Sequence, residues 1–442
     1  MPQATFHFPA GFLWGTATAS HQVEGNNTNN NWAAWEAEEG RILNGDKAGR
    51  ACDWWGGRWK EDFDRAAEAG QNAHRLSIEW SRIQPAENRW DENALDYYRE
   101  MLRGLSERGM TPLVTLHHFT DPLWLTEQGG WENEQVAEKF VAYTRKVVEA
   151  LKEYATLWVT INEPMVYVYS GYMDTAFPPG KRDPDAAFVV MRNMLRAHAG
   201  AYRAIHKIQP AARVGVAQHF RNFRPARPGF PPDVWMVNFI SNNVNYSFVN
   251  ALANGRFSFL AKGGHLPELI GTQDFVGVNY YTTELITFRP LNLGNFFHSR
   301  AYAPDAELSG TGYLANVPSG FMEVMRWSTR FQLPILITEN GVEDAEDHVR
   351  PSYLLQHIHQ VWRALNFNWP VKGYFHWSLV DNFEWERGWS QCFGLWGLDV
   401  DSQRRIHRPS VDLYGEICKA NAISYEMVEK YAPQLIGKLF PG

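Results

Sequence analysis

The chain has 442 residues, a net charge of −7 and no basic stretch, which argues against nucleic acid and anionic membranes as partners. Its apolar fraction of 45% is ample for a large core, but no apolar run approaches the roughly 18 residues that a membrane span needs. The three cysteines, Cys52, Cys392 and Cys418, show neither a metal-binding spacing nor a disulfide framework, and the N-terminus lacks the features of a signal peptide. We therefore expect a cytoplasmic protein with no metal and no cofactor.

Short apolar segments alternate with amphipathic segments along the whole chain, which is the pattern of consecutive β-strands and α-helices. The predicted strands span residues 12–18, 73–80, 112–117, 157–162, 214–218, 275–280, 335–339 and 371–377. Helical patterns lie between them, at 93–108, 136–154, 187–208, 234–254 and 352–365. No repeat or low-complexity hinge divides the chain, so we expect residues 1–442 to form one α/β domain, a single (β/α)8 TIM barrel. Long βα loops are expected at 26–51 and 290–318.

Polar and aromatic residues follow the C-terminal ends of these strands. They are His21-Gln22, Glu79-Trp80, His117-His118, Asn162-Glu163, Gln218-His219, Asn279-Tyr280-Tyr281, Glu339-Asn340 and Trp377-Ser378. The loops that follow barrel strands at this end build the active site of a (β/α)8 barrel. The sequence therefore predicts a site at the C-terminal end of the barrel.

Two of the strand ends carry a glutamate beside an asparagine. The first reads TINEP at 160–164 and the second ITENG at 337–341. Glycoside hydrolysis uses a pair of carboxyl groups that flank the scissile bond, and retaining enzymes hold them about 5–5.5 Å apart. The alternative interpretation is that each glutamate is a salt-bridged residue at the end of a strand.

The neighbours of the two glutamates favour different roles. Pro164 withholds a backbone donor from Glu163, so we expect a raised pKa and an acid role for that carboxyl group. Glu339 needs the opposite environment, and we expect Arg75 to keep it ionised while Tyr281 donates a hydrogen bond. The alternative for Arg75 is a buried structural ion pair.

The chain resembles glycoside hydrolase family 1, the β-glucosidase and β-galactosidase group. The resemblance rests on FLWGTA at 12–17, the NEP and TENG segments, FGL at 393–395 and RPS at 408–410. It implies a (β/α)8 barrel with Glu163 as acid/base and Glu339 as nucleophile. It also implies a sugar-binding shell of Gln22, His118, Asn162, Asn279, Tyr281, Trp377, Glu384 and Trp385.

The residue types of this shell suit a pyranose. Gln22 and Glu384 can each engage two vicinal hydroxyls, and Trp377 offers a flat platform for the apolar face of the ring. His118 and Asn162 can contact the 2- and 3-hydroxyls, where hydrogen bonds strengthen in the transition state.

Departures from the family pattern bear on the substrate. Phospho-glycosidase members lack the acid at the position of Glu384, and Arg387 is the single base in 386–393, so a phosphorylated sugar is disfavoured. Because thioglucosidase members lack the acid glutamate and Glu163 is present, O-glycosides are expected. The segment 312–318 lacks a tryptophan that family members commonly carry, and Tyr313 or Trp327 is expected to compensate.

The leading hypothesis is a retaining exo-β-glycosidase that acts on terminal non-reducing β-D-glucosyl residues, and on β-galactosyl and β-fucosyl residues, in small β-glycosides or oligosaccharides. A non-catalytic carbohydrate-binding barrel and a transglycosidase that uses the same two glutamates are the alternatives. A metal-dependent barrel hydrolase that uses His117, His118, His219 or His376 is a third, although no spaced ligand set supports it.

Overall fold

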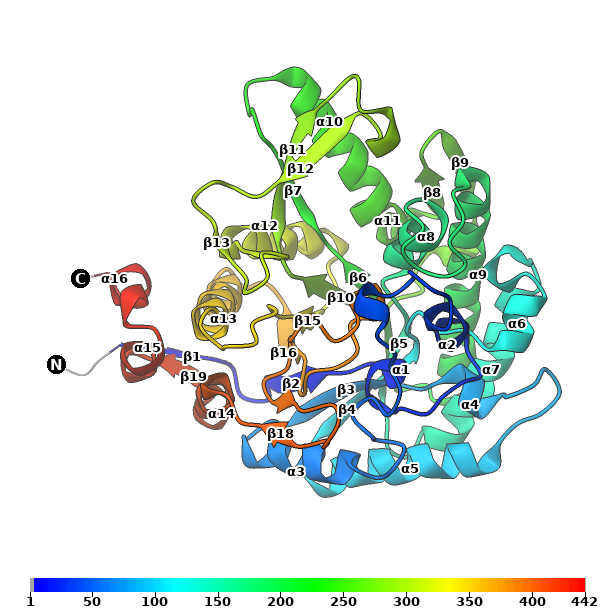
Figure 1. The fold of residues 1–442 in the computed structure, drawn as a ribbon, viewed down its shortest axis with the longest axis horizontal. Coiled ribbons are helices and arrows are strands. Elements are labelled where there is room, and N and C mark those ends of the chain that lie inside the picture. Colours follow the sequence, from blue (N-terminus) through cyan, green and yellow to red (C-terminus); the bar gives the residue numbers. More distant parts are fainter. Residues whose placement is uncertain (1–3, 442) are drawn as a thin grey trace.

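The computed structural model describes residues 4–441, and its central feature is a closed barrel of eight parallel strands (Figure 1). The order around the barrel is β10-β15-β16-β2-β3-β4-β5-β6, and β10 also pairs with β6, which closes the ring. The strands are β2 Leu13–Ala17, β3 Ala73–Ser77, β4 Thr111–His117, β5 Leu157–Asn162, β6 Arg213–His219, β10 Phe275–Tyr280, β15 Ile335–Asn340 and β16 Val371–Trp377. The predicted (β/α)8 barrel is confirmed, and each predicted strand overlaps one of these.

The barrel strands are apolar because helices cover the outer face of the barrel and side chains fill its interior. All residues of β10 and β15 are buried, including the polar ones at their C-terminal ends.

The strand predicted at 73–80 is too long. The backbone N–H of Glu79 donates to the hydroxyl of Tyr98 instead of a neighbouring strand, and the short helix α4 (Trp80–Ile83) follows.

Helices connect the strands around the outside of the barrel (Figure 1). The longer ones are α3 Trp59–Glu68, α5 Glu92–Glu107, α7 Val136–Leu151, α9 Pro184–Ile208, α10 Pro231–Ser241, α11 Ser247–Asn254, α12 Pro318–Ser328, α13 Arg350–Asn366 and α14 Pro409–Ala420. Asp91 and Asp183 begin α5 and α9 by accepting backbone N–H groups of the first turn. Shorter helices are α1 Ser20–Val23, α2 Asn31–Glu36, α6 Leu123–Glu127, α8 Pro164–Tyr172, α15 Tyr425–Tyr431 and α16 Ile436–Leu439.

The helix predicted at 234–254 contains an irregularity that the sequence pattern does not reveal. A π-helical turn, η3 (Asn242–Tyr246), joins α10 to α11, so the helical segment carries a bulge. Such bulges are frequent at functional sites. Here the bulge brings Val244 to the wall of the main cavity.

A small sheet projects beyond the barrel next to α10 (Figure 1). Its strands are β12 His298–Ala301, β11 Thr283–Phe288 and β7 Asn222–Pro225, in that order. The expected loop at 290–318 is therefore partly strand, and it also contains the short pair β13 Glu307–Leu308 and β14 Ala315–Asn316. The expected loop at 26–51 contains α2 and the turn η1 (Leu43–Gly45).

The remaining strands form short pairs on the periphery. They are β1 Thr5–His7 with β19 Ala422–Ser424, β8 Arg256–Phe259 with β9 Lys262–His265, and β17 Gly397–Leu398 with β18 Arg405–Ile406. No helix within residues 4–441 is both long and apolar enough to cross a membrane.

Candidate active site

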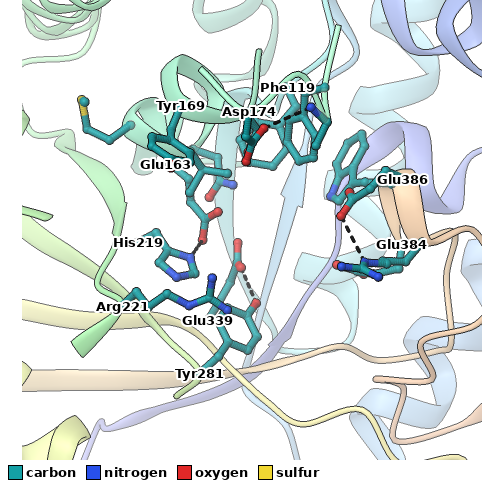
Figure 2. A pocket seen from close by; sticks show the side chains of 18 of the residues that line it. Phe119, Glu163, Tyr169, Asp174, His219, Arg221, Tyr281, Glu339, Glu384 and Glu386 are labelled. Carbon is teal, nitrogen blue, oxygen red and sulfur yellow. Dashed lines mark hydrogen bonds and ion pairs between the residues drawn. The ribbon is translucent and has the colours of Figure 1, made fainter. Parts of the chain in front are cut away.

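A cavity of about 350 Å³ brings most of the predicted site residues together (Figure 2). The predicted residues that line it directly are His118, Asn162, Glu163, Tyr281, Glu339, Trp377, Glu384 and Trp385. Arg75, Asn279 and Gln22 lie behind this wall, where each donates a hydrogen bond to one of the lining carboxyl groups. Several of the predicted strand ends thus converge on one cavity, whereas Glu79 and Trp80 at the end of the predicted strand 73–80 do not line it.

Glu163 stands at the junction of β5 and α8. Its backbone lies in the left-handed region, with φ of 44° and ψ of 57°, and Pro164 begins α8 directly after it. A non-glycine residue adopts this conformation only where its surroundings hold it, at a cost of about 1–3 kcal/mol. The backbone N–H of Glu163 donates to the carbonyl of Ala217 on β6 at 2.7 Å, which fixes the turn. The side chain consequently points into the cavity (Figure 2).

The carboxyl group of Glu163 has two partners from other strands. Nδ1 of His219, at the end of β6, lies 3.0 Å from Oε1. The amide of Asn279, on β10, donates to the same oxygen at 2.8 Å. His219 is a partner that the sequence pattern placed at a strand end but did not connect with Glu163.

The carboxyl group of Glu339 is held differently. The guanidinium of Arg75 donates to Oε1 through Nη1, and the hydroxyl of Tyr281 donates to Oε2 at 2.6 Å. Arg75 is fully buried, and its Nε and Nη2 donate to Thr115 at 3.1 Å and to Asn162 at 2.6 Å. Arg75 therefore forms a buried ion pair with Glu339 itself.

Two asparagines connect the two glutamates. Asn162 accepts from Arg75, and Asn279 donates both to Asn162 at 3.2 Å and to Glu163 at 2.8 Å. The chain of contacts runs from Glu339 through Arg75 and the asparagines to Glu163. Both carboxyl groups are thus oriented by one hydrogen-bond network in the barrel.

The pKa values run against the sequence-based expectation. Burial raises the pKa of Glu339 to about 7, although Arg75 opposes the rise. Burial also favours a higher pKa for Glu163, but a positive charge on His219 and hydrogen bonds from His219 and Asn279 outweigh it and lower that pKa. The expectation of a raised pKa from Pro164 was wrong because the donors to Glu163 come from β6 and β10, not from its own segment.

The lowered pKa of Glu163 has several causes. The charge of His219 is the largest cause that opposes burial, and hydrogen bonds from His219 and Asn279 and the charge of Arg75 act in the same direction. The two carboxyl groups also repel one another, since the charge of Glu163 raises the pKa of Glu339. They titrate as a pair in which one proton is retained longer than the other.

The side chains of Gln22 and Glu384 carry polar atoms that a ligand can contact. Gln22 donates to Asn382, Phe383 and Glu384 at 2.8–3.2 Å, while its buried Oε1 has no hydrogen-bond partner within residues 4–441. Burial and the charges of Glu386 and Glu339 raise the pKa of Glu384 well above its usual range. Both groups therefore offer hydrogen-bonding capacity that a bound polyol could satisfy.

Aromatic rings stand beside these groups. The imidazole of His118 stacks near Trp377 and Trp385, with ring centroids 5.9 Å apart in each case. Burial, together with the charges of Arg75 and His117, lowers the pKa of His118 well below its usual value, so the ring is neutral. Nε2 of His118 lies 3.0 Å from the amide of Asn162, which fixes the ring plane.

One of the two expected substitutes for the missing tryptophan lies at the cavity. Tyr313 lines the wall, with the guanidinium of Arg387 4.9 Å from its ring centroid. Trp327 does not, because it stacks on Tyr246 at 4.2 Å and flanks a separate surface hollow. The expectation for Trp327 was therefore wrong.

The four histidines that the metal-dependent alternative invoked contact different partners and do not form a ligand group. His117 contacts Asp121 at 3.0 Å, whereas His118 contacts Asn162 and His219 contacts Glu163. His376 is buried in β16. Among residues 4–441, no three His, Cys, Asp or Glu side chains are grouped as metal ligands.

A (β/α)8 barrel whose cavity combines two carboxyl groups with tryptophans and polar side chains has the architecture of a barrel glycoside hydrolase. The sequence profile of glycosyl hydrolase family 1 matches residues 4–423. β-Glucosidase A of Thermotoga maritima is 34% identical over 445 residues, which cover 94% of this chain and 98% of that protein.

Solved structures agree with this match. The β-glycosidase from Pyrococcus horikoshii has a TM-score of 0.90 at 37% identity, with 97% of this chain and 98% of that one covered. A Thermotoga maritima β-glucosidase in complex with glucoimidazole has a TM-score of 0.89 at 34% identity, with 95% and 100% covered. The chain belongs to glycosyl hydrolase family 1, and it is an enzyme of the β-glucosidase type.

Proposed function

We propose that the protein is a retaining exo-β-glycosidase that releases terminal non-reducing β-D-glucosyl residues, and also β-galactosyl and β-fucosyl residues, through a covalent glycosyl-enzyme. The observation that carries the proposal is the difference between the two carboxyl groups in one cavity. Glu339 is bound by a guanidinium and a phenol, whereas Glu163 is bound by an imidazole and an amide. Double displacement needs such a division of roles.

In the first step the carboxylate of Glu339 attacks the anomeric carbon while Glu163 protonates the departing glycosidic oxygen. Arg75 and Tyr281 orient the attacking carboxylate and balance its charge. Glu163 must carry a proton in this step; its burial favours the protonated form, while the charge of His219 and the hydrogen bonds to the carboxyl group oppose it. The products of this step are the free aglycone and a glycosyl ester of Glu339.

In the second step the same residues act in reverse. Glu163, now ionised, accepts a proton from water, and the resulting hydroxide attacks the anomeric carbon and releases Glu339. His118 and Asn162 are positioned to bind the 2- and 3-hydroxyls, where hydrogen bonds strengthen as the transition state forms. A sugar acceptor in place of water would give transglycosylation from the same intermediate.

The choice of sugar is supported by relatives. Solved structures of a Thermotoga maritima β-glucosidase contain glucoimidazole in one case and galacto-hydroximolactam in another. Both gluco- and galacto-configured compounds therefore bind a protein of this family. We infer the same tolerance here, with Gln22 and Glu384 as the groups that contact the distal hydroxyls.

The test is to trap the intermediate. Incubation with 2,4-dinitrophenyl 2-deoxy-2-fluoro-β-D-glucoside should inactivate the enzyme with release of one equivalent of dinitrophenol, because the fluorine slows both steps whereas the good leaving group speeds only the first. Mass spectrometry of peptic peptides should then find the fluoroglucosyl group on Glu339. A label on any other residue, or steady turnover that inverts the anomeric configuration, would contradict the proposal.

A further inference from the structure

The part of the cavity wall beyond Glu163 carries two arginines. Arg221 follows β6 by two residues, and Arg300 belongs to β12. Both lie 3.6 Å from the same carboxyl oxygen of Glu284 on β11, and both line the cavity. Figure 2 shows Arg221 extending from the wall that also carries His219, toward the space in front of Tyr281.

The guanidinium of Arg221 forms no hydrogen bond within residues 4–441. Its distance of 3.6 Å from Glu284 is that of an ion pair, too long for a hydrogen bond, and its Nε is enclosed without a partner. The backbone on both sides of the side chain is fixed, because Asn245 in the π-helical turn accepts from the N–H of Arg221 at 3.2 Å and donates to its carbonyl at 2.8 Å. The guanidinium donors are thus held in place and are available to a ligand.

The two guanidinium groups share one direct ion-pair partner, since both lie 3.6 Å from the same carboxyl oxygen of Glu284. Burial lowers the pKa of Arg221, but Glu284 and nearby tyrosines raise it by more, so the side chain stays charged. A partly buried cation without hydrogen bonds is unfavourable unless an anion joins it.

The other charged groups near the two arginines are carboxyl groups. Glu163 lies close enough to Arg221 to interact with it, and Asp174 lies close enough to Arg300. Glu386 belongs to the opposite side of the cavity from Arg221 (Figure 2). Burial raises the pKa of Asp174 and Glu386, which weakens their repulsion of an anion.

We propose that this wall is a subsite for a carboxylate on the aglycone, so that β-glycosides of carboxylate-bearing aromatic alcohols are preferred substrates. A guanidinium plane matches a carboxylate with two parallel hydrogen bonds. The carboxyl groups of Glu163, Glu284 and Asp174 near the two arginines repel a monoanion less than a phosphate, which carries about −1.5 to −2. Tyr169, Phe223 and Tyr313 line the same space and suit an aromatic ring. The inference rests on the proposed hydrolysis of β-glucosides.

The test compares charged and neutral aglycones of the same shape. The 3- and 4-carboxyphenyl β-D-glucosides and their carboxamides are assayed with wild type, Arg221→Met and Arg224→Met. Arg224 is the control because it lies on the neighbouring strand β7 but binds Glu323 at 2.8 Å and does not line the cavity. The ratio of kcat/KM for acid over amide is compared between variants, which cancels the difference in leaving-group reactivity.

We expect Arg221→Met to lower this ratio about 10-fold or more for at least one isomer, because a hydrogen-bonded charge pair is lost. Arg221→Lys should retain part of the preference, and Arg224→Met should equal wild type. An unchanged ratio in Arg221→Met, or an equal loss on acid and amide, would overturn the inference.

A binding measurement separates this inference from the proposed function. Binding of free 4-hydroxybenzoate and 4-hydroxybenzamide is measured by calorimetry with the same variants, which needs no turnover. A preference for the acid that disappears in Arg221→Met supports the subsite even if no glucoside is hydrolysed. Equal binding of acid and amide by wild type overturns the subsite even if β-glucosidase activity is high.

Discussion

The two carboxyl groups of the cavity lie at the C-terminal ends of two barrel strands, yet their surroundings differ in kind. Glu339 lies within β15 and contacts a guanidinium and a phenol, those of Arg75 and Tyr281. Glu163 directly follows β5 and contacts an imidazole and an amide, those of His219 and Asn279. The comparison teaches that burial alone does not assign an acid and a nucleophile. The chemical nature of the partners makes the distinction.

The largest effect should follow from removal of the proposed nucleophile. Glu339→Ala is expected to lower kcat/KM on all β-glycosides by roughly 10⁵-fold, because the covalent route is lost. Azide should restore cleavage of 2,4-dinitrophenyl β-glucoside in this variant and yield the α-glycosyl azide. A β-azide product would instead assign the nucleophile's role to another group.

Removal of the other carboxyl group should give a loss that depends on the leaving group. Glu163→Ala is expected to lower kcat/KM by roughly 10³-fold on phenyl β-glucoside, where general acid catalysis is needed. The loss should be much smaller for 2,4-dinitrophenyl β-glucoside, whose phenolate departs without a proton. Equal losses on both substrates, measured by initial rates, would mean that Glu163 is not the acid.

The hydrogen bond from Tyr281 should contribute less than either carboxyl group. Tyr281→Phe leaves one oxygen of Glu339 without a donor, and the loss of a bond to a charged group is expected to lower kcat by about 10- to 100-fold. Tyr202→Phe is the matched control, because its hydroxyl binds Asp274 at 2.8 Å outside the cavity. If both variants behave alike in steady-state assays, the contact with Glu339 has no special role.

The smallest effect should be a shift of the pH profile in His219→Asn. A charged His219 lowers the pKa of Glu163, so removal of the ring raises that pKa. The acid form of Glu163 then persists to higher pH, and the alkaline limb of the kcat/KM profile should move to higher pH. His206→Asn, which removes a contact with Asp274, should leave the profile unchanged. A downward shift would show that His219 stabilises the protonated carboxyl group.

Several features of the chain were predictable because they are local. An apolar run that ends in a polar residue predicts a buried strand and the side chain that follows it, and this holds for β5 with Glu163 and β15 with Glu339. The π-helical turn that follows α10 was not predictable, since its sequence continues a helical pattern. Trp327 was misplaced because proximity in sequence to the cavity wall does not fix which way a helix side chain points.

By itself the sequence determined the eight strands, their order along the chain and the positions of the two glutamates, because each depends on a short segment of neighbouring residues. The sequence pattern also pointed to Arg75 and Tyr281 as partners of Glu339, whereas only the tertiary structure decided that His219 and Asn279 bind Glu163. His219 reaches Glu163 and Arg75 reaches Glu339 across 56 and 264 residues of sequence. Closure of the barrel makes these contacts, and the electric field at each carboxyl group, which sets its pKa, depends on them.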